Sequence, residues 1–178
     1  MMHYLELSFP LSRPGIEPDR CPDLLPLAQT CVRGLREAGK TVALAESCTG
    51  GLLAKTLTDA AGASDVFQCG IVAYSEQIKQ ELLGVSEETL KRYSVVSAET
   101  AAEMAAGVRE AGHADIGIGV TGVAGPGPDG HHPEGEIYLA LAEESNIRVL
   151  RIPPNPRGRM RNRQLAAEQA LLMLAEIL

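Results

Sequence analysis

The sequence contains few aromatic residues and no tryptophan. Phe and Tyr together make up 3% of its 178 residues. Because single-stranded nucleic acids bind largely by stacking their bases on aromatic side chains, this mode of binding is not expected. The net charge of -7 also argues against general affinity for nucleic acid. Hydrophobic residues still make up 45% of the chain, so a large core built from Ala, Val, Leu and Ile is expected.

Cysteine patterns typical of zinc sites and disulfide scaffolds are missing too. The four cysteines, at positions 21, 31, 48 and 69, form no C-x-x-C pair. We therefore expect free thiols in a reducing cytoplasm and no structural metal. No run reaches the roughly 18 apolar residues that a membrane span requires. Residues 1–11 lack the basic start of a signal peptide, so neither a membrane partner nor export is expected.

Hydrophobic periodicity predicts alternating helices and strands over most of the chain. Residues 1–22 carry prolines at every fourth position from 10 to 22 and are expected to be an irregular extension. Residues 23–178 are expected to form one domain, a three-layer α/β/α sandwich with a mixed, mostly parallel sheet. The predicted strands are 41–46, 67–74, 115–121, 136–142 and 146–152, and the predicted helices are 23–38, 50–60, 75–84, a short one from 86, 97–112 and 157–178.

Residues 41–54 are the most informative segment. A strand ends at Glu46, and Ser47, Cys48 and Thr49 lead through Gly50 and Gly51 into a helix. Such a turn has three interpretations: a nucleophile elbow, an anion cradle formed by the amides of Thr49, Gly50 and Gly51, or a simple N-cap at Ser47. From the residues alone, the cap is the commonest case. Cys48 is a rival nucleophile, but no nearby His would activate it.

A serine nucleophile requires a base, and the histidines are poorly placed to supply one. His3 lies in the extension, His113 at a helix end, and His131 and His132 in a Gly/Pro-rich loop, where a chance metal site is the weaker interpretation. A desolvated lysine is the alternative base, because burial lowers its pKa. Lys55 is expected at the surface. Lys79 follows the second strand, whose end would lie beside Ser47 in a parallel sheet.

Two further features could bind an anion. Thr121 and Gly122 end a buried strand and enter a Gly-rich turn, where Gly125 and neighbouring amides could receive a phosphate or carboxylate. Residues 151–163 hold five arginines and no acid, although the chain as a whole is acidic. Arg159 and Arg163 share one helical face and suit bidentate contact with phosphate. A solvated face is the alternative for this run.

In this order, four segments resemble the CinA C-terminal domain family. They are Ala45-Glu-Ser-Cys-Thr-Gly-Gly51, Gly70-Ile-Val-Ala-Tyr-Ser75 with Lys79 and Glu-Leu-Leu-Gly-Val85, Val95-Val-Ser97, and Thr121-Gly-Val-Ala-Gly-Pro126. The resemblance covers about residues 24–177. Larger members carry an additional N-terminal nucleotide-processing domain, for which this sequence has no room, so the resemblance implies the stand-alone form.

The resemblance implies a nicotinamide-mononucleotide deamidase, an amidohydrolase of pyridine-nucleotide salvage that needs no metal or organic cofactor. Ser47 would attack the carboxamide and Lys79 would carry the proton. Tyr74 and Thr121 would orient or donate hydrogen bonds, and Arg159 would hold the phosphate of a small anionic nucleotide. The long apolar C-terminal helix and the small size favour a homodimer or higher oligomer.

Two departures from the family pattern bear on substrate preference. The family usually has Gly-Asp-Arg before its last helix, where this sequence has Arg157-Gly158-Arg159. The loop from Pro128 to Glu134 contains His131 and His132 instead of the family's Lys-containing version. Two other functions remain open: a non-catalytic nucleotide- or phosphate-binding module linked to competence or DNA-damage responses, and a cysteine hydrolase using Cys48.

Overall fold

A five-stranded sheet forms the centre of the domain. A computed structural model describes residues 23–178, so the predicted extension 1–22 lies outside the described residues. The strand order is β2-β1-β3-β4-β5; β2, β1 and β3 are parallel, and β4 and β5 continue the sheet antiparallel. The mixed sheet is thus confirmed, with three of the five strands parallel. The strands are β1 (Val42–Glu46), β2 (Phe67–Val72), β3 (Ile116–Gly122), β4 (Ile137–Ala142) and β5 (Ile147–Ile152).

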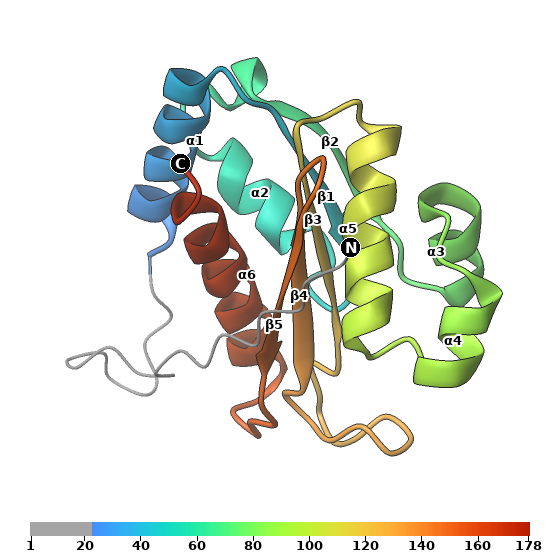
Figure 1. The fold of residues 1–178 in the computed structure, drawn as a ribbon. Helices are drawn as coiled ribbons and strands as arrows, with labels where there is room; N and C mark the ends of the chain where they lie inside the picture. Colours follow the sequence, from blue (N-terminus) through green and yellow to red (C-terminus); the bar gives the residue numbers. More distant parts are fainter. Residues whose placement is uncertain (1–22) are drawn as a thin grey trace.

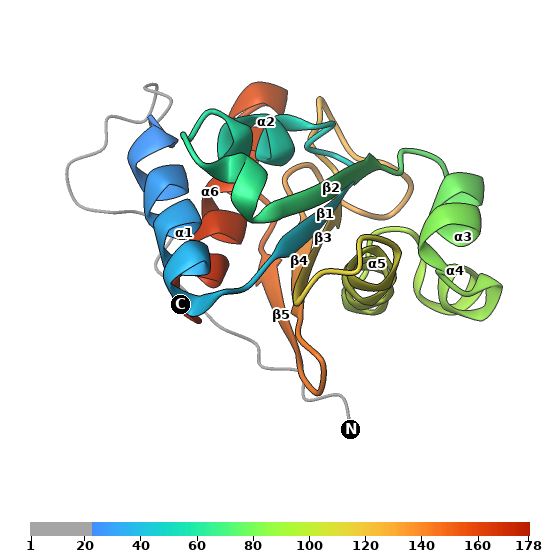
Figure 2. The same ribbon diagram turned by 90° about the horizontal axis from the view of Figure 1, so that it is seen from above.

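Helices cover both faces of this sheet, which confirms the three-layer α/β fold (Figures 1 and 2). On one face lie α1 (Leu25–Ala38), α2 (Leu52–Thr58) and α6 (Arg159–Ala175). On the other lies α5 (Ala98–Ala111), with α3 (Glu76–Leu83) and α4 (Glu87–Tyr93) packed against it. A 3-10 turn at Ala63–Asp65 precedes β2. No helix in residues 23–178 is long and apolar enough to cross a bilayer.

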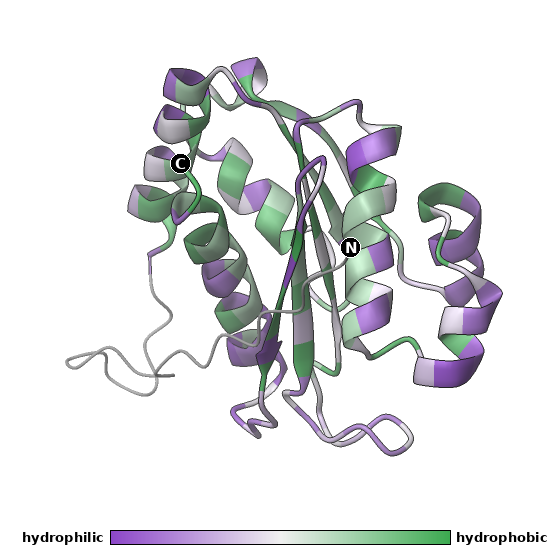
Figure 3. Ribbon diagram, viewed as in Figure 1, coloured by the Kyte–Doolittle hydropathy of each residue, from purple (hydrophilic) through white to green (hydrophobic). Residues whose placement is uncertain are grey.

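Small residues let α5 approach the sheet closely. A Cβ at Gly117 would lie 2.1 Å from the Ala105 carbonyl oxygen, and one at Gly119 would lie 2.4 Å from that of Ala101. The larger apolar side chains, such as Leu44, Ile118 and Leu139, belong to the core under α1, α2 and α6. The apolar sides of the helices face the sheet on both faces (Figure 3). The sheet therefore has a thin small-residue layer on one side and an aliphatic core on the other.

Local capping signals predicted three helix starts correctly. The hydroxyls of Ser75, Ser86 and Ser97 each accept a hydrogen bond from the backbone N–H three residues later. The predicted helices 50–60 and 157–178 were too long at both ends, compared with α2 and α6 in the structure. Residues 50 and 51 have φ of 58° and 89°, so α2 begins only at Leu52; Gly158, at φ 86°, delays α6 to Arg159.

Candidate active site

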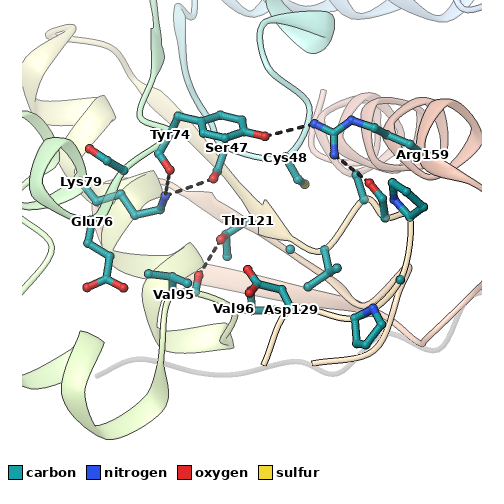
Figure 4. A pocket seen from close by; sticks show the side chains of 18 residues that line it. Ser47, Cys48, Tyr74, Glu76, Lys79, Val95, Val96, Thr121, Asp129 and Arg159 are labelled. Atoms are coloured by element: carbon teal, nitrogen blue, oxygen red, sulfur yellow. Dashed lines mark hydrogen bonds between the residues drawn. The ribbon is translucent and has the colours of Figure 1, made fainter. Parts of the chain in front are cut away.

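A cavity of about 430 Å³ opens at the carboxyl ends of β1, β2 and β3. Open α/β sheets bind ligands at this edge, because the loops leaving neighbouring strands diverge there. The Gly-rich loop after β3 and the start of α6 complete the wall. Six of its polar side chains come from separate segments (Figure 4): Ser47, Tyr74, Lys79, Thr121, Asp129 and Arg159.

The turn after β1 places Ser47 at this cavity. The Ser47 N–H donates to the Val120 carbonyl at 2.9 Å, which extends the β1–β3 pairing past the end of β1. Ser47 caps no described helix, since α2 has Gly51 as its N-cap residue and no side-chain cap. Of the three interpretations of this turn, the simple N-cap at Ser47 is therefore wrong, and the hydroxyl is available to the cavity.

The anion at the start of α2 is the chain's own Glu46. Its buried carboxylate accepts hydrogen bonds from the N–H groups of Gly51, Leu53 and Ala54, at 2.9, 3.1 and 2.8 Å. The positive end of the helix dipole is thus already neutralised from within. Sequence reasoning missed this role. The available signal was an acidic residue that ends a buried strand directly before a helix.

The predicted anion cradle at Thr49, Gly50 and Gly51 is accordingly wrong. None of the three lines the cavity, and the N–H groups of Gly50 and Gly51 donate to Ser47 O and Glu46 Oε2. Arg163 does not line the cavity either. Its Nε and Nη2 donate to the Thr49 carbonyl at 3.1 and 2.6 Å, so its guanidinium stabilises the turn between β1 and α2 without lining the cavity.

Lys79 lies beside Ser47, as the parallel pairing of β1 and β2 predicts. Its side chain is 2% exposed, and Nζ is 3.1 Å from Ser47 Oγ. Nζ also donates to the carbonyls of Ala73, at 2.8 Å, and Tyr74, at 3.5 Å. Burial lowers the pKa of Lys79, against smaller opposing effects from Cys48 and Glu76. A neutral amine has two N–H donors and one lone pair, so the two carbonyls and the Ser47 hydroxyl satisfy it completely.

Tyr74 and Arg159 meet at the open side of the cavity. The Tyr74 side chain is 62% exposed, and its hydroxyl accepts a hydrogen bond of 3.1 Å from Arg159 Nη2. Arg159 Nη1 donates to the Gly125 carbonyl at 2.8 Å. Arg159 therefore sits between the loop after β2 and the loop after β3, with its cation at the rim (Figure 4).

Thr121 and the glycines after it form the inner wall. Thr121 is 1% exposed, and its Oγ1 donates to the Val95 carbonyl at 2.6 Å. Since its only hydroxyl proton is used there, Thr121 can offer a ligand lone pairs but no proton. Gly122 and Gly125 line the cavity, and a Cβ at Gly125 (φ 95°) would lie 2.5 Å from the Glu134 carboxyl carbon.

The other candidate residues have different surroundings. Cys48 reaches the cavity, but burial raises the pKa of its thiol to about 12, which disfavours the reactive thiolate. Lys55 is exposed and paired with Asp59, as expected for a surface residue. His132 is hydrogen-bonded to Ser94 and Glu136. Within residues 23–178, no group of three or more His, Cys, Asp or Glu side chains could hold a metal ion.

Comparison with known proteins identifies the family. Residues 24–178 match the profile of the CinA C-terminal domain. The chain is 48% identical over 151 residues to a CinA-like protein of Desulfovibrio desulfuricans, and this alignment covers 83% of this chain and 36% of that protein. It is 43% identical over 139 residues to a CinA-like protein of Kosmotoga olearia, covering 77% of this chain and 34% of the relative. The chain thus spans about a third of the length of these curated relatives.

Solved structures agree with the sequence matches. A competence/damage inducible protein from Agrobacterium tumefaciens superposes with a TM-score of 0.84 at 36% identity, covering 88% of this chain and 96% of that one. A CinA superfamily protein from Escherichia coli superposes with a TM-score of 0.83 at 30% identity, covering 92% and 100% of the two chains. The profile match and these similarities together show that the chain belongs to the CinA C-terminal domain family.

Proposed function

We propose that this domain hydrolyses the carboxamide of nicotinamide mononucleotide to nicotinate mononucleotide and ammonia, with Ser47 as nucleophile and Lys79 as base. The observation that carries the proposal is the 3.1 Å contact between Ser47 Oγ and the buried Lys79 Nζ. A serine becomes an effective nucleophile only beside a group that can take its proton. The resemblance to the deamidase family supplies the substrate.

In the first step, Ser47 Oγ attacks the carboxamide carbon while its proton passes to Lys79 Nζ. The lowered pKa of Lys79 favours the neutral amine that this step requires. The C–N bond then breaks, Lys79 returns the proton to the leaving nitrogen, and ammonia departs. An acyl ester on Ser47 remains.

In the second step, water hydrolyses this ester. Lys79 Nζ takes a proton from the water, the hydroxide attacks the acyl carbon, and the proton returns to Ser47 Oγ. Nicotinate mononucleotide is released. The same amine thus acts as base and acid in both halves of the reaction.

The backbone directly after Ser47 supports charge stabilisation. Among the hydrogen bonds between different described residues, none uses the N–H of Cys48 as donor; its one acceptor is the residue's own thiol, which is a weak one. The N–H that follows a nucleophile is a common oxyanion donor in α/β hydrolases. We assign this N–H to the negative oxygen that forms during attack.

Arg159 would bind the phosphate at the rim. Its guanidinium uses two contacts, to Tyr74 and Gly125, and a guanidinium has five N–H donors. The cavity volume of about 430 Å³ lies within the range typical of small-molecule sites. Tyr74 would then orient Arg159 as well as border the substrate.

The test is ammonia release from nicotinamide mononucleotide by the purified protein, by Ser47→Ala and by Lys79→Ala. We expect each variant to lose at least about a thousandfold in kcat. Lys55→Ala, which changes an exposed lysine of the neighbouring helix, should keep wild-type activity. Full activity in Ser47→Ala or Lys79→Ala would contradict the mechanism.

A second candidate function is a non-catalytic nucleotide-binding module in competence or damage responses. The observation that favours it is that a structural relative is named as a competence/damage inducible protein. This function predicts that nicotinamide mononucleotide stabilises the protein against heat without turnover. It also predicts no effect of Lys79→Ala on binding.

A further inference from the structure

Three polar side chains outside the Ser47–Lys79 pair form a hydrogen-bonded array. Ser94 Oγ lies 2.7 Å from His132 Nε2, and His132 Nδ1 lies 2.9 Å from Glu136 Oε2. The side chains of His132 and Glu136 are 14% and 7% exposed, so water competes little for these contacts. The proposed mechanism uses none of the three.

The array joins two segments of the cavity wall that are far apart in sequence. His132 pairs with Asp129 through two backbone hydrogen bonds of 3.0 Å, which close the turn 129–132; this turn and the two residues before it form the loop tip 127–132. Residues 127–129 of this tip line the cavity. Ser94 is followed by Val95 and Val96, which line the cavity beside Thr121 (Figure 4).

The Ser94 end of the array is firmly held. Ser94 has φ 72°, a conformation that a non-glycine residue keeps only where its surroundings enforce it. Its Oγ accepts from the Val96 N–H at 3.1 Å, and its carbonyl accepts from the hydroxyls of Ser97 and Thr100 at 3.0 and 2.8 Å. His132 is thus attached to a fixed point, next to the Val95 carbonyl that accepts from Thr121.

The Glu136 end is fixed by charge. Arg151 donates to Glu136 Oε1 through Nε and Nη2, and the Tyr138 hydroxyl donates to the same oxygen at 3.3 Å. Burial alone would raise the pKa of Glu136, but the hydrogen bonds and charges of Arg151 and His132 lower it overall. An ionised Glu136 keeps a proton on His132 Nδ1, which directs Nε2 toward Ser94.

We propose that His132 is a positioning residue that clamps the loop tip 127–132 to the Ser94 turn and thereby fixes the width of the substrate cavity. The inference rests on the proposed function of that cavity. His132 touches neither Ser47 nor Lys79 in any described contact, so it acts on substrate binding through the wall. Removing the clamp should weaken binding of the nucleotide more than it slows the chemical step.

The clamp holds whether His132 is neutral or protonated. In the neutral ring, Ser94 Oγ donates to Nε2; in the charged ring, Nε2 donates to Oγ, and the hydroxyl proton turns to the Val96 carbonyl at 3.4 Å. The groups around the ring are Glu136, with Arg151 and Tyr138 behind it, and His131, whose ring centre is 4.0 Å away. The hydrogen bonds of the array can therefore form with either protonation state of the ring.

The experiment compares His132→Ala and Ser94→Gly with wild type. Glycine fits the φ of 72° and removes only the hydroxymethyl side chain, including its contacts with His132 and the Val96 N–H, so this variant tests the clamp even where His132→Ala folds poorly. His131→Ala, which removes the exposed neighbouring ring, is the matched control. Hydrogen–deuterium exchange of residues 123–135 should be faster in both clamp variants and unchanged in the control. KM for nicotinamide mononucleotide should rise roughly tenfold or more, with kcat within about twofold.

These outcomes separate the clamp from the proposed function. Wild-type exchange rates in both clamp variants, or an unchanged KM despite faster exchange, would overturn the clamp. If the wild-type protein released no ammonia, the proposed function would fail, whereas the exchange rates would still decide the clamp.

Discussion

At the scale of single residues, the burial of Lys79 determines how activity responds to pH. Burial lowers its pKa, so protonation removes the base at a lower pH than for an exposed lysine. We expect kcat/KM to rise with pH through this lowered pKa and to level off above it. Lys79→Arg, which stays protonated, should be inactive at every pH. A pH–rate profile checks both results; a profile that falls as pH rises through neutrality would contradict the role of Lys79 as base.

The same shift predicts how stability changes with pH. Between the lowered and the ordinary pKa of lysine, the unfolded chain binds more protons at Lys79 than the folded chain does. The contribution of Lys79 to the free energy of unfolding therefore rises with pH across this window. Lys79→Met removes the buried amine, so we expect the stability of this variant relative to wild type to decrease as pH rises. Urea denaturation at a series of pH values measures the difference.

Glu46 has a structural role that was missed at the level of the sequence. Glu46→Gln keeps the shape but replaces one acceptor oxygen by an NH₂ group, which faces backbone N–H donors. We expect a loss of about 2 kcal/mol in the free energy of unfolding, measured by urea denaturation. Glu144→Gln, in the exposed β4–β5 turn, should change stability little. Equal stability of the two variants would show that the three hydrogen bonds contribute nothing net.

At the scale of elements, local signals predicted the helices and strands, whereas tertiary contacts determine which side chains meet at the site. Ser75, Ser86 and Ser97 act through neighbours three residues away, so their roles could be read from the sequence. Lys79 was placed beside Ser47 because parallel strands end at one edge. Arg163 was misassigned, because its partner, the Thr49 carbonyl, is 114 residues away and offers no sequence signal. His132 was recognised as a departure from the family's usual loop, but its contact with Ser94 forms only because the loop after β3 folds back onto the Ser94 turn.

The packing of α5 on the sheet gives a prediction for an element pair. Gly117→Ala would place a Cβ 2.1 Å from the Ala105 carbonyl, so α5 must move away from β3. We expect a loss of about 1 to 3 kcal/mol in the free energy of unfolding, as for other overpacked cores. Gly70→Ala is the matched control, because its Cβ would meet only the side chains of Ala54 and Phe67, at 3.2 Å. A control as unstable as Gly117→Ala would contradict the argument from backbone contact.

At the scale of the whole molecule, the structure changes the argument for an oligomer. The expectation rested on an apolar C-terminal helix, but the apolar residues of α6 other than Met160 are buried or partly buried in the domain's own core. Assembly into a homodimer or higher oligomer remains a prediction without that support. The exposed apolar side chains that remain near the cavity are Val72, Tyr74 and Met160.

The cavity instead makes ligand binding a property of the whole fold. Its wall combines the ends of β1, β2 and β3, the loop after β3 and the start of α6, so a bound nucleotide should stabilise all of them together. At a free concentration of about a hundred times its Kd, nicotinate mononucleotide should add about 2.7 kcal/mol to the free energy of unfolding. This gain is measured as a rise in Tm. Arg159→Ala should lose most of this gain, whereas Arg157→Ala, an exposed arginine outside the cavity wall, should keep it.

The phosphate is the part of the ligand that this comparison isolates. Nicotinate riboside has the same ring carboxylate and ribose without the phosphate, so its weaker stabilisation should be the same in wild type and Arg159→Ala. If Arg159→Ala lowered the effect of the riboside as much as that of the nucleotide, Arg159 would act by holding Tyr74 and the Gly125 carbonyl in place. The ratio of the two ligand effects therefore distinguishes a phosphate contact from support of the rim, since only a direct contact depends on the phosphate charge.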